Sequence, residues 1–156
     1  MAFEHYIYAD GKQLRCGYTT GTCAALAASG AVQRLLTGVW PETVSLRTPK
    51  GLTVEVPLEH CRMQGDTAQC SVRKDGGDDV DKTTGALIQA SVSLSDTPGV
   101  RIRGGQGVGR VTKPGLDQPV GEAAINRVPR QMIREAVEAA CRTADYDGGA
   151  EVTISV

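Results

Sequence analysis

The segment GYTTGTCAALAA, residues 17–28, places glycines and hydroxyl side chains directly before an alanine-rich run. The start of a helix presents unpaired backbone amides and a partial positive charge, and small residues in front of it let an anion approach closely. Thr19, Thr20, Gly21 and Thr22 therefore fit a site for a carboxylate or a phosphate. They also fit a threonine-capped helix without a ligand, which is the commoner use of such residues.

Cys23 follows this loop at the predicted helix start. A cysteine in that position can be a nucleophile, because the helix end favours the thiolate. Neither histidine of the chain, His5 or His60, sits in a recognisable pairing motif with it. We therefore expect Cys23 to be a small buried residue.

A second segment, RKDGGDDVDKTTGA at residues 73–86, crowds aspartates around a pair of glycines. The aspartates are Asp75, Asp78, Asp79 and Asp81. Hard cations bind such oxygen clusters, but the spacing departs from the calcium-loop pattern, so we predict no metal site. Crowded carboxylates can also hold a raised pKa and transfer protons, whereas an ordinary acidic turn is simply solvated. The sequence leaves these last two interpretations open.

A third segment, GGQGVGRVTKPG at residues 104–115, is rich in glycine and carries the cations Arg110 and Lys113. Gly105, Gly107 and Gly109 suggest a dinucleotide fingerprint, but Arg110 occupies the position of its last glycine, so that interpretation fails. Further arginines flank the segment: Arg101, Arg103, Arg127 and Arg130. Such cations can bind several carboxylates, and the alternative is a solvated basic loop.

The elements that must position these segments follow from hydrophobic periodicity. Helical spacing predicts a helix over 22–37, capped by Thr22 and ended by Gly38, and a second helix from Pro129 to about residue 142. Alternation predicts a hairpin over 43–58 and strands over 67–73, 86–94 and 150–156, with a long loop over 104–121. This order predicts an α+β (mixed α/β) fold, with a mixed sheet of about five to seven strands and two main helices packed on it.

Length and composition indicate one domain over residues 1–156. The 17 basic and 18 acidic side chains nearly cancel, which gives no field that favours a nucleic acid or a membrane surface. Five cysteines without a C-x-x-C pair, and no basic and apolar leader, indicate a cytoplasmic protein. No apolar run approaches the roughly 20 residues that a membrane-spanning helix needs. Assembly into a homo-oligomer is left open.

In their order and spacing, the three segments resemble a known family. LRCGYTTGTCAALAA, VRKDGGDDVDKTTGA and GGQGVGRVTKPGL, followed by EAAINRVPRQMI, are similar to the cobalt-precorrin-5B C1-methyltransferase family (CbiD) of cobalamin biosynthesis. The resemblance runs from about residue 14 to the end of the sequence. It implies methyl transfer from S-adenosylmethionine to ring carbon C1 of a cobalt-corrin precursor.

The resemblance also implies roles for residues. The corrin precursor carries acetate and propionate arms, so the resemblance implies that the helix start and the cationic loop bind the substrate. The residues concerned are Thr19, Thr20, Gly21, Thr22, Lys74, Gly107, Gly109, Arg110 and Lys113. It implies that Asp75, Asp78 and Asp79 accept a proton or orient the ring. Methyl transfer from a sulfonium depends mainly on alignment, so little acid or base catalysis is needed.

The sequence departs from the family pattern in two ways. Thr84 stands where a histidine is expected and Val80 where proline is usual, so no histidine-dependent role is carried over. Family members are also longer, and the later part, which the resemblance implies helps to bind S-adenosylmethionine, has no counterpart here. We therefore expect an N-terminal, tetrapyrrole-binding portion of a methyltransferase. The alternative is a standalone binding module for a small anionic metabolite.

Overall fold

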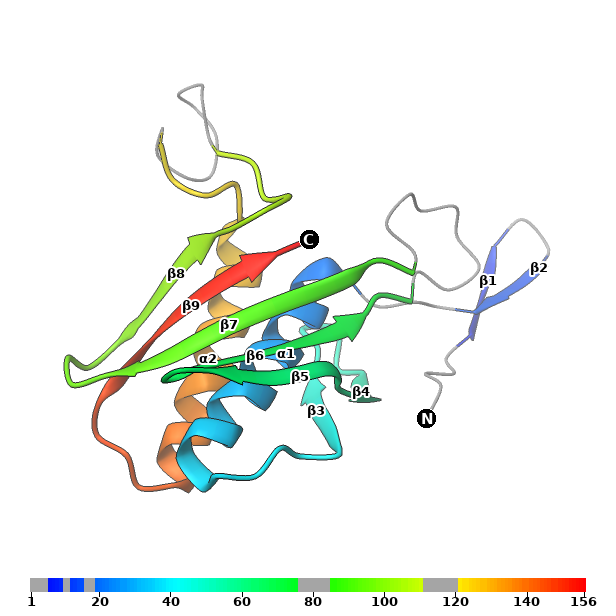
Figure 1. Ribbon diagram of the computed structural model, residues 1–156. Coiled ribbons are helices and arrows are strands. Elements are labelled where there is room, and N and C mark those ends of the chain that lie inside the picture. Colours follow the sequence, from blue (N-terminus) through cyan, green and yellow to red (C-terminus); the bar gives the residue numbers. More distant parts are fainter. Residues whose placement is uncertain (1–5, 10–11, 16–18, 76–84, 111–120) are drawn as a thin grey trace.

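A mixed five-stranded sheet forms the centre of the protein (Figure 1). The computed structural model describes residues 6–9, 12–15, 19–75, 85–110 and 121–156. The strand order is β5-β6-β7-β9-β8, in which only β8 and β9 are parallel neighbours. These strands are β5 (Glu59–Gln64), β6 (Thr67–Arg73), β7 (Leu87–Ser95), β8 (Val100–Gly104) and β9 (Gly149–Ser155).

Two antiparallel pairs lie outside this sheet: β1 (Tyr6–Ala9) with β2 (Lys12–Arg15), and β3 (Thr43–Arg47) with β4 (Thr53–Pro57). The β3–β4 pair is the hairpin predicted over 43–58, and it buries Val44, Val54 and Val56 in the common core. The two helices and the mixed sheet confirm the predicted α+β fold.

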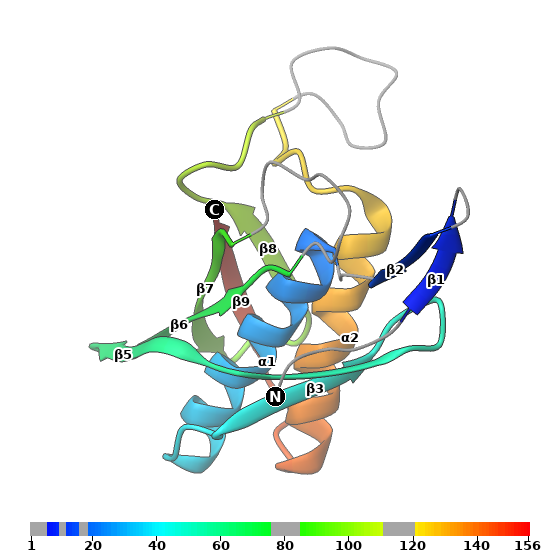
Figure 2. The same ribbon diagram turned by 90° about the vertical axis from the view of Figure 1, so that its right-hand side faces the viewer.

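Both helices, α1 (Thr20–Thr37) and α2 (Arg127–Thr143), cover the same face of the sheet and run in the same direction (Figures 1 and 2). Every residue of α1 from Gly21 to Val32 is buried, and most of them are small, so neighbouring elements approach the helix closely. A Cβ at Gly21 would lie 3.0 Å from Cβ of Pro129 in α2. The first turns of the two helices are therefore in contact.

Strand β7 shows how the sheet divides into an apolar and a polar face. Ile88, Ala90 and Val92 have no exposed surface and belong to the core. Gln89, Ser91 and Ser93 alternate with them and point to the face away from the helices, because successive side chains of a strand project to opposite sides. This confirms the predicted division of the strand into one core side and one solvated side.

Both helices begin earlier than predicted. The cap of α1 is Thr19, whose Oγ1 accepts the N–H of Thr22 at 3.1 Å, so the expected capping role of Thr22 is wrong. Gly38 ends α1 in the left-handed conformation with φ 82°, as expected. Helix α2 starts at Arg127, which makes Pro129 its third residue. This position suits proline, because amides of the first turn have no partner within the helix.

Strands β5 and β8 were not predicted. All residues of β5 but Glu59 are exposed, so its sequence carries no alternation of apolar and polar residues. Strand β8 does alternate, with Val100 and Ile102 buried and Arg101 and Arg103 at the positions between and after them, but it is short. Within the described residues, no helix combines the length and the apolar character needed to cross a membrane.

Candidate functional site

One end of the molecule contains described residues that belong to each segment singled out by the sequence. Strand β6 ends there and β7 begins there, β8 and β9 end there, and both helices have their N-termini there (Figures 1 and 2). Strands β8 and β9 run parallel and are connected through α2, so the carboxyl ends of both strands lie at the same end as the N-termini of the helices, whose unpaired amides favour anions. This end is therefore the first place to look for a site.

Of the three threonines at the start of α1, Thr22 is buried. Thr22 is only 2% exposed, and its hydroxyl lies 3.0 Å from that of Thr19. Thr19 is exposed and Thr20 half-buried, so these two remain accessible at the helix end. Cys23 donates its backbone N–H to the carbonyl of Thr19, which completes the first turn.

Cys23 is fully buried, as expected from the sequence. Burial raises the pKa of its thiol to about 12. The neighbouring charges of Lys74 and Asp75 have smaller and opposing effects on this pKa. The thiol is therefore neutral and no nucleophile, and the helix start lies beside the first residues of the acidic segment.

Backbone hydrogen bonds join the first and last residues of the acidic segment. Lys74 donates its backbone N–H to the carbonyl of Ala86 at 2.9 Å, and Gly85 donates to the carbonyl of Lys74 at 2.8 Å. Arg73 donates to Glu59 on β5 at 2.9 and 3.2 Å and to the carbonyl of Gly85 at 2.9 Å. These bonds fix Lys74, which is 8% exposed, and half-buried Asp75 next to α1.

Asp78, Asp79 and Asp81 lie outside the described residues. Among the residues that are described, no three His, Cys, Asp or Glu side chains gather closely enough to hold a metal ion.

The glycine-rich segment is attached to the end of β9. Gly105 donates to the carbonyl of Ile154 at 2.7 Å, and Val156 donates to the carbonyl of Gln106 at 2.8 Å. Gly107 has φ 80°, and a Cβ there would lie 2.5 Å from the carbonyl oxygen of Val156. Only glycine fits this turn without strain.

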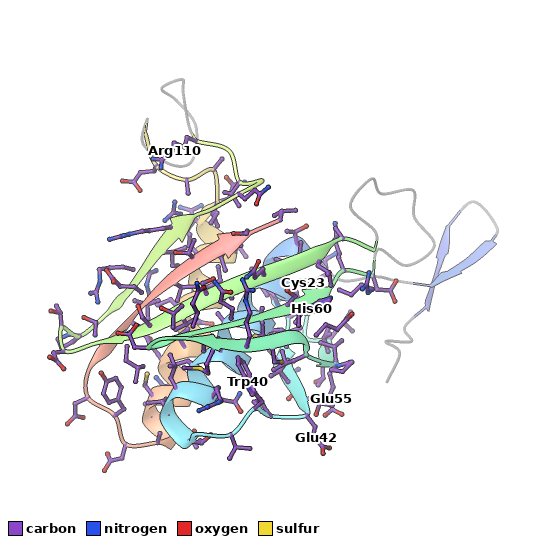
Figure 3. The ribbon with its side chains drawn as sticks, in the orientation of Figure 1. Cys23, Trp40, Glu42, Glu55, His60 and Arg110 are labelled. Atoms are coloured by element: carbon purple, nitrogen blue, oxygen red, sulfur yellow. The ribbon has the colours of Figure 1, made fainter. Side chains whose placement is uncertain are left out.

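Arg110 lies beyond this turn, at the top of Figure 3, well separated from Cys23 in that view. It pairs with Ala123 in an antiparallel bridge, and its Nη1 donates to the carbonyl of Gly121 at 3.1 Å. Gly109 accepts the N–H of Ala124 at 2.7 Å. Lys113 lies outside the described residues.

Arg130 connects the predicted residues at the start of α1 with those around Arg110. Its Nε donates to the carbonyl of Ile125 at 2.6 Å and its Nη2 to that of Ala123 at 2.8 Å. Ala123 is the bridge partner of Arg110, and the residue before Arg130 is Pro129, which contacts Gly21. A continuous path of contacts therefore runs from the start of α1 to Arg110. Because the guanidinium of Arg130 donates to two backbone carbonyls on this path, its role is to stabilise the fold there.

Two other predicted cations are also engaged by the protein itself. Arg101 and Arg103 both approach Glu151 of β9, at 3.6 and 3.3 Å, on the sheet face away from the helices. These exposed pairs lie apart from the helix starts.

A groove of about 570 Å³ lies elsewhere, between β3 and the later turns of α1 and α2. Its lining includes Leu36, Leu46 and Met132, and none of the predicted site residues that the structure describes belongs to it. The predicted residues thus share one end of the protein but not this groove.

Known proteins are similar to this chain over nearly its whole length. A family model described as CbiD matches residues 7–156. A cobalt-precorrin-5B C(1)-methyltransferase of Geobacillus kaustophilus is 54% identical over 93% of this chain and 39% of its own length. A protein of the same name from Pseudomonas putida W619 is 48% identical over 92% of this chain and 39% of its own length.

A solved structure agrees with the sequence comparisons. The crystal structure of a cobalamin biosynthesis protein (cbiD) from Archaeoglobus fulgidus superposes with a TM-score of 0.66 at 33% identity, over 96% of this chain and 46% of that one. The chain thus spans about two fifths of the length of these curated relatives. Because the family model covers almost every residue, the chain belongs to the CbiD family.

Proposed function

We propose that this chain is the tetrapyrrole-binding part of a methyltransferase that methylates C1 of cobalt-precorrin-5B, the reaction named for its relatives. The observation that carries the proposal is the family match over residues 7–156, together with the position of the helix N-termini and of the ends of β8 and β9 at one end of the fold. Because the chain covers 39% of the relatives, the chemical step is assigned to the longer protein.

In this proposal the gathered residues hold the acidic arms of the substrate. The exposed Thr19 and half-buried Thr20 begin the helix whose Cys23 lies near Lys74, and the contacts of Arg130 connect this helix start with Arg110. Carboxylates prefer such a combination of helix amides, a lysine and an arginine. Substrate-binding roles for Gly107, Gly109 and Lys113 belong to the same proposal, as does Thr22 in support of the helix start.

The methyl donor is proposed to be S-adenosylmethionine. The described residues offer no adenosine site of the familiar kind, since the glycine turn after β8 leads into a bridge at Arg110 rather than into a helix. The polar residues at this end suit carboxylates better than an adenine ring. We therefore propose that the donor binds mostly to the part of the longer protein that this chain does not include.

The role of the acidic segment is to orient the ring or accept a proton. Asp75 is half-buried beside Lys74 at the substrate end, where its carboxylate can act on a bound macrocycle. Asp78 and Asp79 are proposed for the same role. In-line methyl transfer gains most of its rate from alignment, so these carboxylates contribute a secondary effect. We also propose that the protein works in the cytoplasm, without a nucleic-acid or membrane partner.

The test is to mix the purified chain with a cobalt-corrin precursor and methyl-labelled S-adenosylmethionine. We expect bound pigment and no transferred label, whereas the longer Geobacillus kaustophilus relative binds pigment and transfers label. Replacing Arg110 and Lys113 together by alanine is expected to weaken pigment binding about tenfold or more, because two cations are lost. Failure of the unmodified chain to bind pigment would contradict the proposal.

A further inference from the structure

The sheet face away from the helices contains a hollow of about 460 Å³, which we call the open-face hollow. The residues that matter for its chemistry are His60, Arg62, Ser71, Gln89, Gln106 and Ser155. They come from β5, β6 and β7, from the end of β9, and from the glycine turn after β8. The volume lies within the range of small-molecule sites.

One side of the hollow is formed by β5, an edge strand with irregular pairing. The pairing of β5 with β6 shifts register between Glu59 and Arg62, and His60 has φ 52°. A non-glycine residue with positive φ is uncommon, and bulges of this kind re-aim side chains next to binding sites. His60, labelled in Figure 3, lines the hollow from this bulge.

The glycine turn forms the opposite wall. A Cβ at Gly105 would collide with Oγ of Ser155 and lie 3.1 Å from Cγ2 of Thr153, so the turn packs directly on the open face. The bond from Val156 to the carbonyl of Gln106 fixes Gln106 at the rim. The hollow therefore adjoins Gly107, at the same end as the proposed substrate site.

Among the described residues, the lining offers many hydrogen-bond donors and no acidic side chain. Arg62 donates Nε to Gln69 at 2.6 Å, and no other bond of Arg62 occurs among the described residues, so its terminal nitrogens are available. Ser71 is 5% exposed, and no described hydrogen bond uses its hydroxyl. Because no fully buried polar side-chain atom lacks a partner among the described residues, this hydroxyl opens into the hollow.

We propose that the open-face hollow binds a carboxylate group, held by Arg62 and by the hydroxyl and amide donors of Ser71, Gln89, Gln106 and Ser155. Guanidinium and neutral donors, with no acidic side chain among the described lining residues, favour an anionic acceptor. Two sources fit this chemistry: one side arm of the corrin, which rests on the proposed function, or the carboxylate of a separate small metabolite. Contiguity with Gly107 favours the side arm.

The test compares three variants in equilibrium binding of cobyrinic acid, a cobalt corrin with free carboxylate arms. Arg62→Gln removes the cation, and Gln106→Glu places a like charge at the exposed rim with almost no change of shape. Arg103→Gln is the matched control, because Arg103 lies on the same sheet face but pairs with Glu151 outside the hollow. Thermal unfolding establishes that each variant is folded.

We expect Arg62→Gln and Gln106→Glu each to weaken cobyrinic acid binding about tenfold, and Arg103→Gln to change it less than about twofold. A corrin whose arms are carboxamides is expected to lose its sensitivity to Gln106→Glu. If cobyrinic acid binds equally well to all variants, the inference is wrong while the proposed function stands. An equal loss in the Arg103→Gln control would overturn it as well.

Titration with glutarate, followed by amide resonances of Ser71, Gln89 and Ser155, separates the two sources. Shifts with cobyrinic acid but none with glutarate support a corrin side arm. Shifts with glutarate in a protein that binds no corrin support a separate metabolite, and they contradict the proposed function alone. Absence of shifts at these residues with both probes overturns the inference.

Discussion

The two faces of the five-stranded sheet carry different kinds of side chain, apolar on the face covered by the helices and mostly polar on the open face. The helix-covered face buries Val72, Ile88, Val92 and Val152 without any exposed surface. The open face carries Gln69, Ser71, Gln89 and Thr153 at the alternate positions of the same strands. One strand thus contributes to stability on one side and to hydrogen bonding on the other, so substitutions on neighbouring residues should have different consequences.

The sharpest way to break this comparison uses adjacent residues of β7. Ile88→Ala is expected to lower the free energy of unfolding by about 2–5 kcal/mol, because it removes a fully buried side chain and leaves a cavity. Gln89→Ala on the open face should change it by less than about 0.5 kcal/mol. Urea unfolding measures both values, and equal losses would show that the two faces are not distinct.

A second test addresses the path between the helix starts and the glycine segment. Arg130→Gln is expected to lower the free energy of unfolding by about 1–2 kcal/mol, because the carbonyls of Ala123 and Ile125 lose a charged donor. It should also weaken corrin binding, since Ala123 supports Arg110. Arg134→Gln, on the exposed side of α2, is the control and should have neither effect.

The cysteines buried at the helix-covered face predict that the free energy of unfolding depends on pH. Burial raises the pKa of Cys23 and Cys70 to about 12 from an ordinary value of 9.0, so the folded protein keeps both thiols protonated. Because the pKa is higher in the folded state, the contribution of these thiols to the free energy of unfolding is fully present below pH 9. It decreases at higher pH, as the thiols ionise in the unfolded chain. Between pH 8 and pH 10 the free energy of unfolding should fall by about 1 kcal/mol for each thiol.

Urea unfolding at several pH values measures this slope. Cys23→Ala should reduce the slope by roughly half of the thiol contribution, whereas Cys61→Ala, in the exposed strand β5, should change it much less. An unchanged slope in Cys23→Ala would show that the thiol ionises in the folded protein.

The smallest expected effect concerns the cap of α1. Thr19→Ala removes the hydroxyl that accepts the N–H of Thr22 and should cost about 1 kcal/mol. Thr19→Asp keeps a capping oxygen and should preserve stability, but its negative charge should weaken corrin binding if this helix end holds a carboxylate. Thermal unfolding and corrin titration separate the two effects.

Much of the fold could be predicted from periodicity. Alternation in β7 and helical spacing in α2 each located the buried face, because the apolar positions match one side of the element. Strand β5 escaped prediction, since an edge strand with exposed residues has no apolar pattern. The cap at Thr19 was misplaced because three threonines surround Gly21 and only the backbone geometry selects among them.

The candidate site was harder to predict than the fold. The resemblance proposed Lys74 and the cationic glycine segment proposed Arg110 as substrate-binding residues, and these roles stay predictions. No sequence pattern indicated that Arg130 donates to two backbone carbonyls. The open-face hollow depends on a bulge at His60 and on contact between segments distant in sequence, and neither leaves a local pattern. Both require the three-dimensional arrangement.

The most direct test of the central claim is to map, by amide chemical shifts, where cobyrinic acid binds on this chain. Our account predicts shifts at Thr19–Gly21, Lys74 and Gly107–Arg110, with little change at the opposite end, around the β7–β8 turn at Thr97–Gly99. Shifts concentrated at that turn or at the last turns of α1 and α2 would contradict it.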